Sequence, residues 1–218
     1  MNATHVIMAA PLFSAGLALS FLGFYRRVLL QPIYLYWLLF ASGIVCFLLV
    51  QAEAAGIALG PVGTIASIVG IPACGMSWLL SRALFRRDGA ATLWPLGVVL
   101  ALCLTSLLIV LARLAGIGSD NAVMEMVGTV HGLTSSTVLL LALVEPVEGF
   151  RRSLPRAEKL FRLIFILGYG ALVAVSVIWE RQAVQATDGE TALSAVKVTC
   201  AMIALAGATL AVAWRARH

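Results

Sequence analysis

The sequence predicts an all-α polytopic membrane protein, a bundle of seven transmembrane helices with the N-terminus outside and the C-terminus inside. Of the 218 residues, 61% are hydrophobic and only 11% are charged, whereas a soluble domain is about half apolar and about a quarter charged. The 15 basic and 10 acidic residues cluster and leave seven apolar stretches, each near the roughly 20 residues that cross a bilayer. We therefore expect one transmembrane domain over residues 1–218 and no soluble catalytic domain.

Charges and turns separate the first three spans. The first span stops at the two arginines of 26–27, and the turn at 31–32 starts the second. A glycine- and proline-rich turn over 56–63 leads to the third span, which the charges at 86–88 end. Pro72 should bend this third span, because proline removes a backbone hydrogen-bond donor.

The remaining spans are bounded in the same way. A turn over 116–120 separates the fourth span from the fifth, a basic loop over 145–159 precedes the sixth, and a polar stretch over 180–190 precedes the seventh. The seven spans are expected at residues 4–24, 33–51, 61–85, 93–114, 121–144, 160–179 and 191–214.

The basic residues favour one orientation of these spans. When the loops after the first, third and fifth spans share a side with the C-terminus, that side holds 12 of the 15 lysines and arginines. Because Lys and Arg concentrate in cytoplasmic loops, we expect this side to be cytoplasmic and the protein to lie in a bacterial inner membrane. Anionic lipid headgroups suit such a basic side, so no nucleic-acid partner is needed to explain the charge.

The fifth span is unusually polar for a helix in lipid. His131 and Ser135 lie one turn apart on one face, with Thr134 beside them and Glu125 nearer the start of the span. Polar groups in the hydrocarbon layer are costly and often functional, and histidine titrates near neutral pH. These four residues are candidates for sensing a ligand or a proton. The alternative is structural: hydroxyls that bond to their own helix and a histidine that bonds a neighbouring helix.

Small residues mark two faces for helix packing. Gly128 and Gly132 in the fifth span, and Gly207 and Ala211 in the seventh, recur at four-residue spacing, which lets helices approach closely. Such faces either hold the bundle together or receive a membrane-protein partner or a second copy of the chain.

Charged residues offer contacts on both sides. Lys197 and Glu190 are seven residues apart near the outer end of the seventh span, where lysine can reach water. A retinal Schiff base at Lys197 is disfavoured, because the third span has no carboxylate to serve as a counter-ion. On the cytoplasmic side, candidate contacts for lipid headgroups or a partner are Arg86, Arg87, Arg151, Arg152 and Arg156.

No metal site or cofactor is expected. Besides His131, the histidines are His5 and His218 at the chain ends, so paired axial ligands for a transmembrane haem are missing. The four cysteines form no close pair, and we interpret them as small apolar fillers.

Three segments carry a resemblance to a known group of proteins. The stretch 78–88, followed by Trp94 and Pro95, resembles the third-to-fourth helix junction of the seven-transmembrane input regions of bacterial membrane-anchored AraC-type regulators. Residues 139–162 resemble the loop between the fifth and sixth helices of that group, and 34–40 are similar to the second helix of related seven-transmembrane signalling receptors. The resemblance implies a sensor. Those proteins continue into an output domain, which we do not expect after residues 214–218.

Three functions remain open from the sequence. The first is a non-enzymatic sensor or accessory subunit that passes a signal to, or assembles with, a separate partner. The second is a small-molecule transporter or channel. Pro72 and the polar fifth span favour this function, although no inverted repeat is visible. The third is an intramembrane enzyme acting on lipid, with Glu125, His131 or Arg82 as candidate groups and no catalytic spacing to support it.

Overall fold

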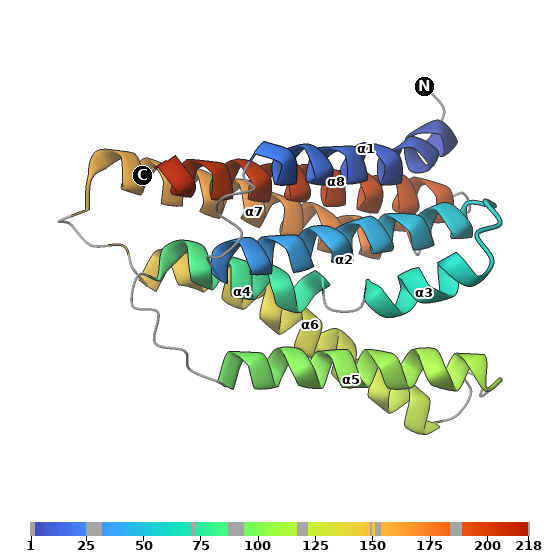
Figure 1. Ribbon diagram of the computed structural model, residues 1–218. Coiled ribbons are helices and arrows are strands. Elements are labelled where there is room, and N and C mark those ends of the chain that lie inside the picture. The colour runs from blue at the N-terminus through green and yellow to red at the C-terminus, as the bar shows by residue number, and fades with distance from the viewer. Residues whose placement is uncertain are drawn as a thin grey trace.

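The described residues of the computed structural model are 3–24, 32–70, 73–86, 94–116, 122–148, 150, 154–183 and 189–217. They form the helices α1 (Ala3–Phe24), α2 (Pro32–Ala54), α3 (Pro61–Val69), α4 (Ala73–Phe85), α5 (Trp94–Leu114), α6 (Ala122–Glu148), α7 (Arg156–Ala183) and α8 (Gly189–Arg217). Helices α1, α2, α5 and α8 run roughly along one direction, α6 crosses the bundle obliquely, and α1 and α5 lie at opposite edges of the bundle (Figure 1). The prediction of an all-α fold is confirmed.

The helices begin and end within a few residues of the expected spans. The third span is the exception, because it divides into α3 and α4. Gly70 ends α3, and its N–H donates to the carbonyl oxygen of Ala66 at 2.8 Å. Residues 71–72, which include the proline that was expected to bend this span, lie outside the described residues.

A large hydrophobic core joins α1, α2, α4 and α8. Trp37 on α2 is fully buried, packs on Phe21 of α1 with ring centroids 4.3 Å apart, and donates its indole N–H to Thr209 of α8 at 3.1 Å. A smaller core joins α4, α5 and α6 around Trp78 and Ala142. Since α4 takes part in both cores, it connects the two halves of the bundle.

Five segments of the described residues are long and apolar enough to cross a membrane: Ile33–Ala54, Pro61–Phe85, Trp94–Ala112, Ala122–Glu148 and Ser194–Ala216. Helix α1 adds a shorter apolar stretch, Ala9–Leu22. The expectation of a membrane protein with apolar spanning helices is therefore supported by the fold.

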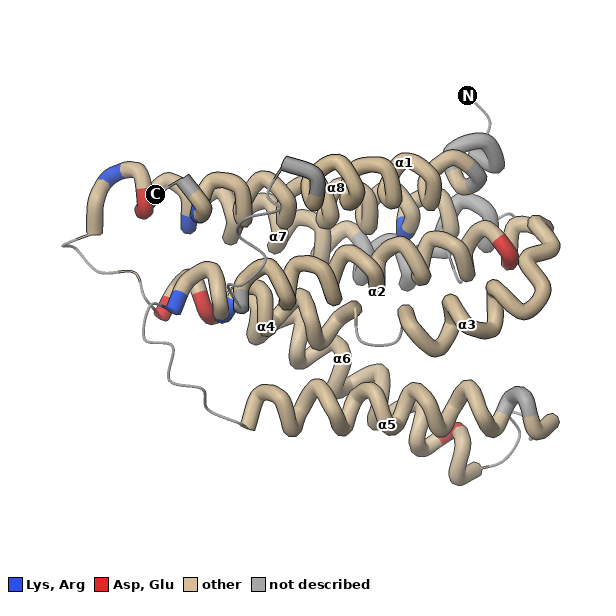
Figure 2. Tube along the Cα trace, in the orientation of Figure 1, with Lys and Arg blue, Asp and Glu red and all other residues tan. Residues whose placement is uncertain are grey.

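Most of the described charged residues gather at one end of the bundle (Figure 2). At this end α4 and α6 finish, α7 begins and α8 finishes, and we call it the charged end. Because these four helix termini meet there, side chains far apart in sequence can pair.

Candidate functional site

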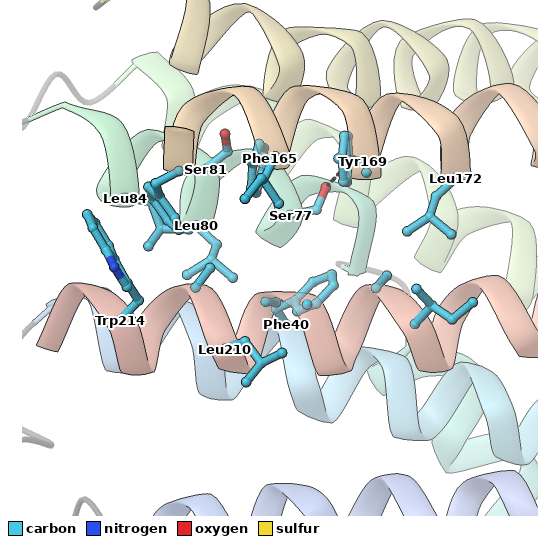
Figure 3. A pocket seen from close by; sticks show the side chains of 18 of the residues that line it. Phe40, Ser77, Leu80, Ser81, Leu84, Phe165, Tyr169, Leu172, Leu210 and Trp214 are labelled. Atoms are coloured by element: carbon cyan, nitrogen blue, oxygen red, sulfur yellow. Dashed lines mark hydrogen bonds between the residues drawn. The ribbon is translucent and has the colours of Figure 1, made fainter. Parts of the chain in front are cut away.

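An apolar pocket of about 610 Å³ lies between α4, α7 and α8, with Phe40 of α2 also in its wall (Figure 3). Its volume is in the range of small-molecule sites. Gly207 and Gly168 open onto it, since a Cβ built on either glycine would meet no heavy atom within 4 Å. The other lining residues are Ser77, Leu80, Ser81, Leu84, Phe161, Ile164, Phe165, Tyr169, Leu172, Ile203, Ala204, Ala208, Leu210, Ala211, Ala213 and Trp214.

Aromatic rings form one wall of the pocket. Phe161, Phe165 and Tyr169 repeat at four-residue spacing on α7, which places them on one helix face. The rings of Phe165 and Tyr169 are stacked at a centroid distance of 5.5 Å, and Phe161 stacks on Trp214 of α8 at 4.2 Å. The wall is aromatic and apolar, as suits a site for a hydrophobic molecule.

The hydroxyl groups in the pocket wall already have partners within the protein. Ser77 donates to the carbonyl oxygen of Cys74 at 2.6 Å, and its oxygen lies 3.2 Å from the Tyr169 hydroxyl. Ser81 donates to the carbonyl oxygen of Ala142 at 2.7 Å. Because Ser77 uses its own proton on Cys74, the Tyr169 hydroxyl is the donor in the Ser77–Tyr169 pair.

A buried carboxylate holds α4 and α6 together at the charged end. Glu145 of α6 is 4% exposed and accepts from the indole of Trp78 at 3.1 Å, from Arg82 at 3.4 Å and from Arg86 at 2.5 Å. Arg86 also pairs with Glu148. The hydrogen bond with Glu145 raises the pKa of Arg86 above its ordinary value, so this side chain stays charged.

A buried guanidinium and its carboxylate partner together connect four helices at the same end. Arg162 of α7, 4% exposed, donates to Glu158 at 3.1 Å, to the carbonyl oxygen of Pro146 at 2.9 Å and to that of Phe85 at 3.0 Å. Arg215 of α8 donates to the other oxygen of Glu158 at 3.0 Å. The termini of α4, α6, α7 and α8 are thereby tied to one another.

Residues of each of these two clusters recur at four-residue spacing in the sequence, a pattern that our prediction did not include. Trp78, Arg82 and Arg86 follow one another at four-residue spacing, as do Glu158 and Arg162. This spacing predicts one charged face on each helix. The sequence does not show that Glu145, which we placed in a loop, lies inside α6 and faces α4.

His131 lies against α5. Its ring nitrogens are within 3.2–3.3 Å of the hydroxyls of Thr105 and Ser106, and Nε2 lies 3.4 Å from the Ser135 hydroxyl. Thr134 instead donates to the carbonyl oxygen of Val130, one turn earlier in its own helix. This arrangement agrees with the structural alternative for the polar fifth span, and a sensing role for His131 and Ser135 stays a prediction.

The other candidates on α6 do not join this cluster. Glu125 is exposed and lies about 9 Å from His131 along the helix axis, at 1.5 Å per residue. Gly128 and Gly132 are also exposed, and a Cβ on either would meet no heavy atom within 4 Å. Within the described part of the chain, no helix packs on these two glycines, so their packing role depends on a partner.

The second pair of packing residues lies in the pocket wall. Ala211 is 6% exposed, whereas Gly207 is exposed and borders open space. Both residues therefore contribute to a cavity rather than to a close helix contact within the described chain.

The remaining charged candidates are only partly described. Arg86 is in the charged end as given above, and Arg156 is exposed at the start of α7. Arg87, Arg151 and Arg152 lie outside the described residues, as does the side chain of Glu190. Lys197 is half-buried in α8. In the described residues no group of three or more His, Cys, Asp or Glu side chains is placed to hold a metal ion.

The fold and the pocket define the class of protein: an all-α helical bundle that contains helices long and apolar enough to span a membrane, with an apolar cavity between three of its helices. No family model, curated protein or solved structure matches the chain. The pocket and the charged end are therefore the features of the molecule that bear on its function.

Proposed function

We propose that the chain is a non-enzymatic membrane sensor or accessory subunit that binds a hydrophobic molecule in the pocket between α4, α7 and α8. The pocket itself is the observation that supports this function most directly. Ile164, Ile203 and Leu210 line it and are 61%, 52% and 71% exposed. These side chains face the surroundings of the bundle, so a molecule dissolved in the bilayer has a path into the pocket.

We further propose seven spans in a bacterial inner membrane, with the charged end in the cytoplasm. The concentration of arginines at that end supports this orientation. Helix α7 counts as a span because residues 163–179 carry no charged side chain. Helices α3 and α4 then form one broken span, which adds up to seven and leaves the N-terminus outside.

The charged end offers a route by which ligand binding in the pocket changes the structure on the cytoplasmic side. Helices α4, α7 and α8 line the pocket, and the same helices carry Arg82, Arg162 and Arg215 at the charged end. A ligand that separates α4 from α7 would stretch the bond from Arg162 to the carbonyl oxygen of Phe85 at the end of α4. A separate partner on the cytoplasmic side could read this change, in keeping with the resemblance to input regions of membrane regulators.

A photocrosslinking experiment tests the binding function. A long-chain alcohol bearing a diazirine is added to membranes that contain the protein, and crosslinked peptides are identified by mass spectrometry. We expect labelling of the α7 and α8 pocket residues that excess unlabelled alcohol suppresses. Gly207→Trp should block this labelling by filling the pocket, whereas Gly97→Trp should not, although a Cβ at either glycine meets no heavy atom within 4 Å.

Labelling that cannot be saturated, or that is equal in the two tryptophan variants, would contradict a binding pocket. The transporter alternative predicts in addition that the purified protein moves its ligand across liposomes. The enzyme alternative has less support, because Glu145, the partner of Arg82, lies about 21 Å from His131 along α6, at 1.5 Å per residue. These candidate groups do not form one site.

A further inference from the structure

We infer that the ligand of this pocket is an acyl-chain amphiphile with one anionic headgroup, and that Arg215 binds the headgroup. The inference rests on the proposed function and specifies the chemical class of its ligand. Three features of the pocket support it: its length, the use of the Ser77, Ser81 and Tyr169 hydroxyl protons within the protein, and the charge at one of its ends.

The pocket has the length of one bilayer leaflet. Along α8 its lining runs from Ile203 to Trp214, which is about 16 Å at 1.5 Å per residue. The hydrocarbon layer is about 30 Å thick, so the pocket spans about half of it. Trp214 lies at one end of the pocket and Leu172 at the other (Figure 3). An amphiphile in the bilayer would place its headgroup at the Trp214 end.

The wall away from that end suits a hydrocarbon chain. The stacked rings of Phe165 and Tyr169 form it, and the protons of Ser77 and Ser81 are used within the protein. An anionic group deep in the pocket would find no free donor among these serines, and burying a charge without a partner is costly. The charged part of the ligand therefore belongs at the end of the pocket.

Arg215 is the side chain placed to receive it. It follows Ala211 by four residues, so it continues the pocket-lining face of α8 by one turn. A guanidinium has five N–H donors, and in the described structure Arg215 donates to Glu158 alone. Its side chain is 17% exposed, which leaves the group shielded but accessible.

The local charge favours an anion. Glu158 is shared by Arg162 and Arg215, so these three side chains carry a net charge of about +1 at neutral pH. One carboxylate or phosphate would balance that charge, and charge-assisted bonds from arginine to such groups are strong. A cationic amphiphile would be repelled, and a neutral one would leave the charge uncompensated.

The test uses the purified full chain in a neutral detergent, with binding of radiolabelled palmitate as the readout. Competitors are hexadecan-1-ol, hexadecyltrimethylammonium and a short-chain phosphatidylglycerol. We expect palmitate to bind at least about 10-fold more tightly than hexadecan-1-ol, as one charge-assisted hydrogen bond predicts. Arg215→Gln should remove this preference, and Arg156→Gln should keep it, although both substitutions remove one positive charge from the same end.

The possible outcomes distinguish failure of the anionic headgroup from failure of the proposed binding function. Equal binding of palmitate and hexadecan-1-ol, or an unchanged preference in Arg215→Gln, would overturn the anionic headgroup while the pocket stands. Binding of none of the amphiphiles would overturn the proposed function itself. Competition by phosphatidylglycerol supports a bilayer lipid as the source of the ligand, and palmitate binding that phosphatidylglycerol does not displace supports a free fatty acid.

If Arg215→Gln does not fold, Arg215→Lys supplies the test. Lysine keeps the charge and can pair with Glu158, but it loses the planar fork of the guanidinium. We expect Arg215→Lys to retain the preference for palmitate over hexadecan-1-ol, and loss of that preference in a folded Arg215→Lys protein would contradict recognition by charge.

Discussion

The two halves of α6 differ in how their polar side chains are bonded: the inner half, residues 138–148, finishes at the charged end, and the outer half, residues 122–137, lies away from it. Near the charged end, Val138 and Ala142 are fully buried against α4 and α5, and Glu145 accepts bonds from three side chains. Toward the opposite end, Met126 and Leu133 are more than 60% exposed. The outer half is richer in polar side chains, yet most of its hydroxyls bond to their own helix.

The strongest tertiary interactions of a span are therefore not found where its polar residues are most numerous. A hydroxyl in a helix can be satisfied by the carbonyl one turn before it, so it needs no neighbouring helix. A carboxylate has no proton to donate to a carbonyl, and Glu145 finds two of its donors on α4 and the third at Arg86, the next residue after that helix. The single carboxylate Glu145 therefore organises more of the bundle than the serines and threonines of the outer half.

The largest expected effect is from Glu145→Ala in the inner half. This substitution leaves Trp78, Arg82 and Arg86 without their shared acceptor, and breaking a buried pair costs about 3 kcal/mol or more. Unfolding of the purified protein in sodium dodecyl sulfate measures the loss. Glu148→Ala is the matched control with an expected cost below about 0.5 kcal/mol, because its side chain is 54% exposed. Equal losses in the two variants would show that burial does not distinguish these carboxylates.

An intermediate effect is expected when a glycine in a close contact between helices is replaced by alanine, compared with a glycine that borders open space. A Cβ on Gly75 of α4 would lie 2.9 Å from Val99 of α5, so Gly75→Ala should lower the free energy of unfolding by about 1–2 kcal/mol through overpacking. Gly128→Ala in the outer half of α6 should have no destabilising effect, because the space there is open. A destabilised Gly128→Ala would instead indicate a partner or second copy packed on that face.

A smaller loss than for Glu145→Ala or Gly75→Ala is expected from His131→Ala. Its hydrogen bonds to Thr105 and Ser106 join α5 to α6, and such bonds between membrane helices contribute about 0.6 kcal/mol on average. We expect a loss of about this size in the unfolding measurement and unchanged palmitate binding. Loss of palmitate binding with unchanged stability would reveal a sensing role for His131.

The sequence by itself determined the helical fold, the apolar spans and the gathering of basic residues at alternate helix ends. These features are local: the length of an apolar run and the position of its flanking charges decide them without reference to any other part of the chain. For the same reason the polar residues of the fifth span were visible from the sequence, whereas Thr105 and Ser106, which contact His131 from α5, were not.

Only the tertiary structure decided where the pocket lies and which charges pair. The pocket requires α4, α7 and α8 to meet, and the partners Phe85 and Pro146 of Arg162 are 77 and 16 residues away along the chain. No periodicity within one helix encodes which faces of three helices turn toward one another. That choice follows from the simultaneous packing of Trp37, Trp78 and Leu205 in the two cores, because each helix can bury only the face that its neighbours leave room for.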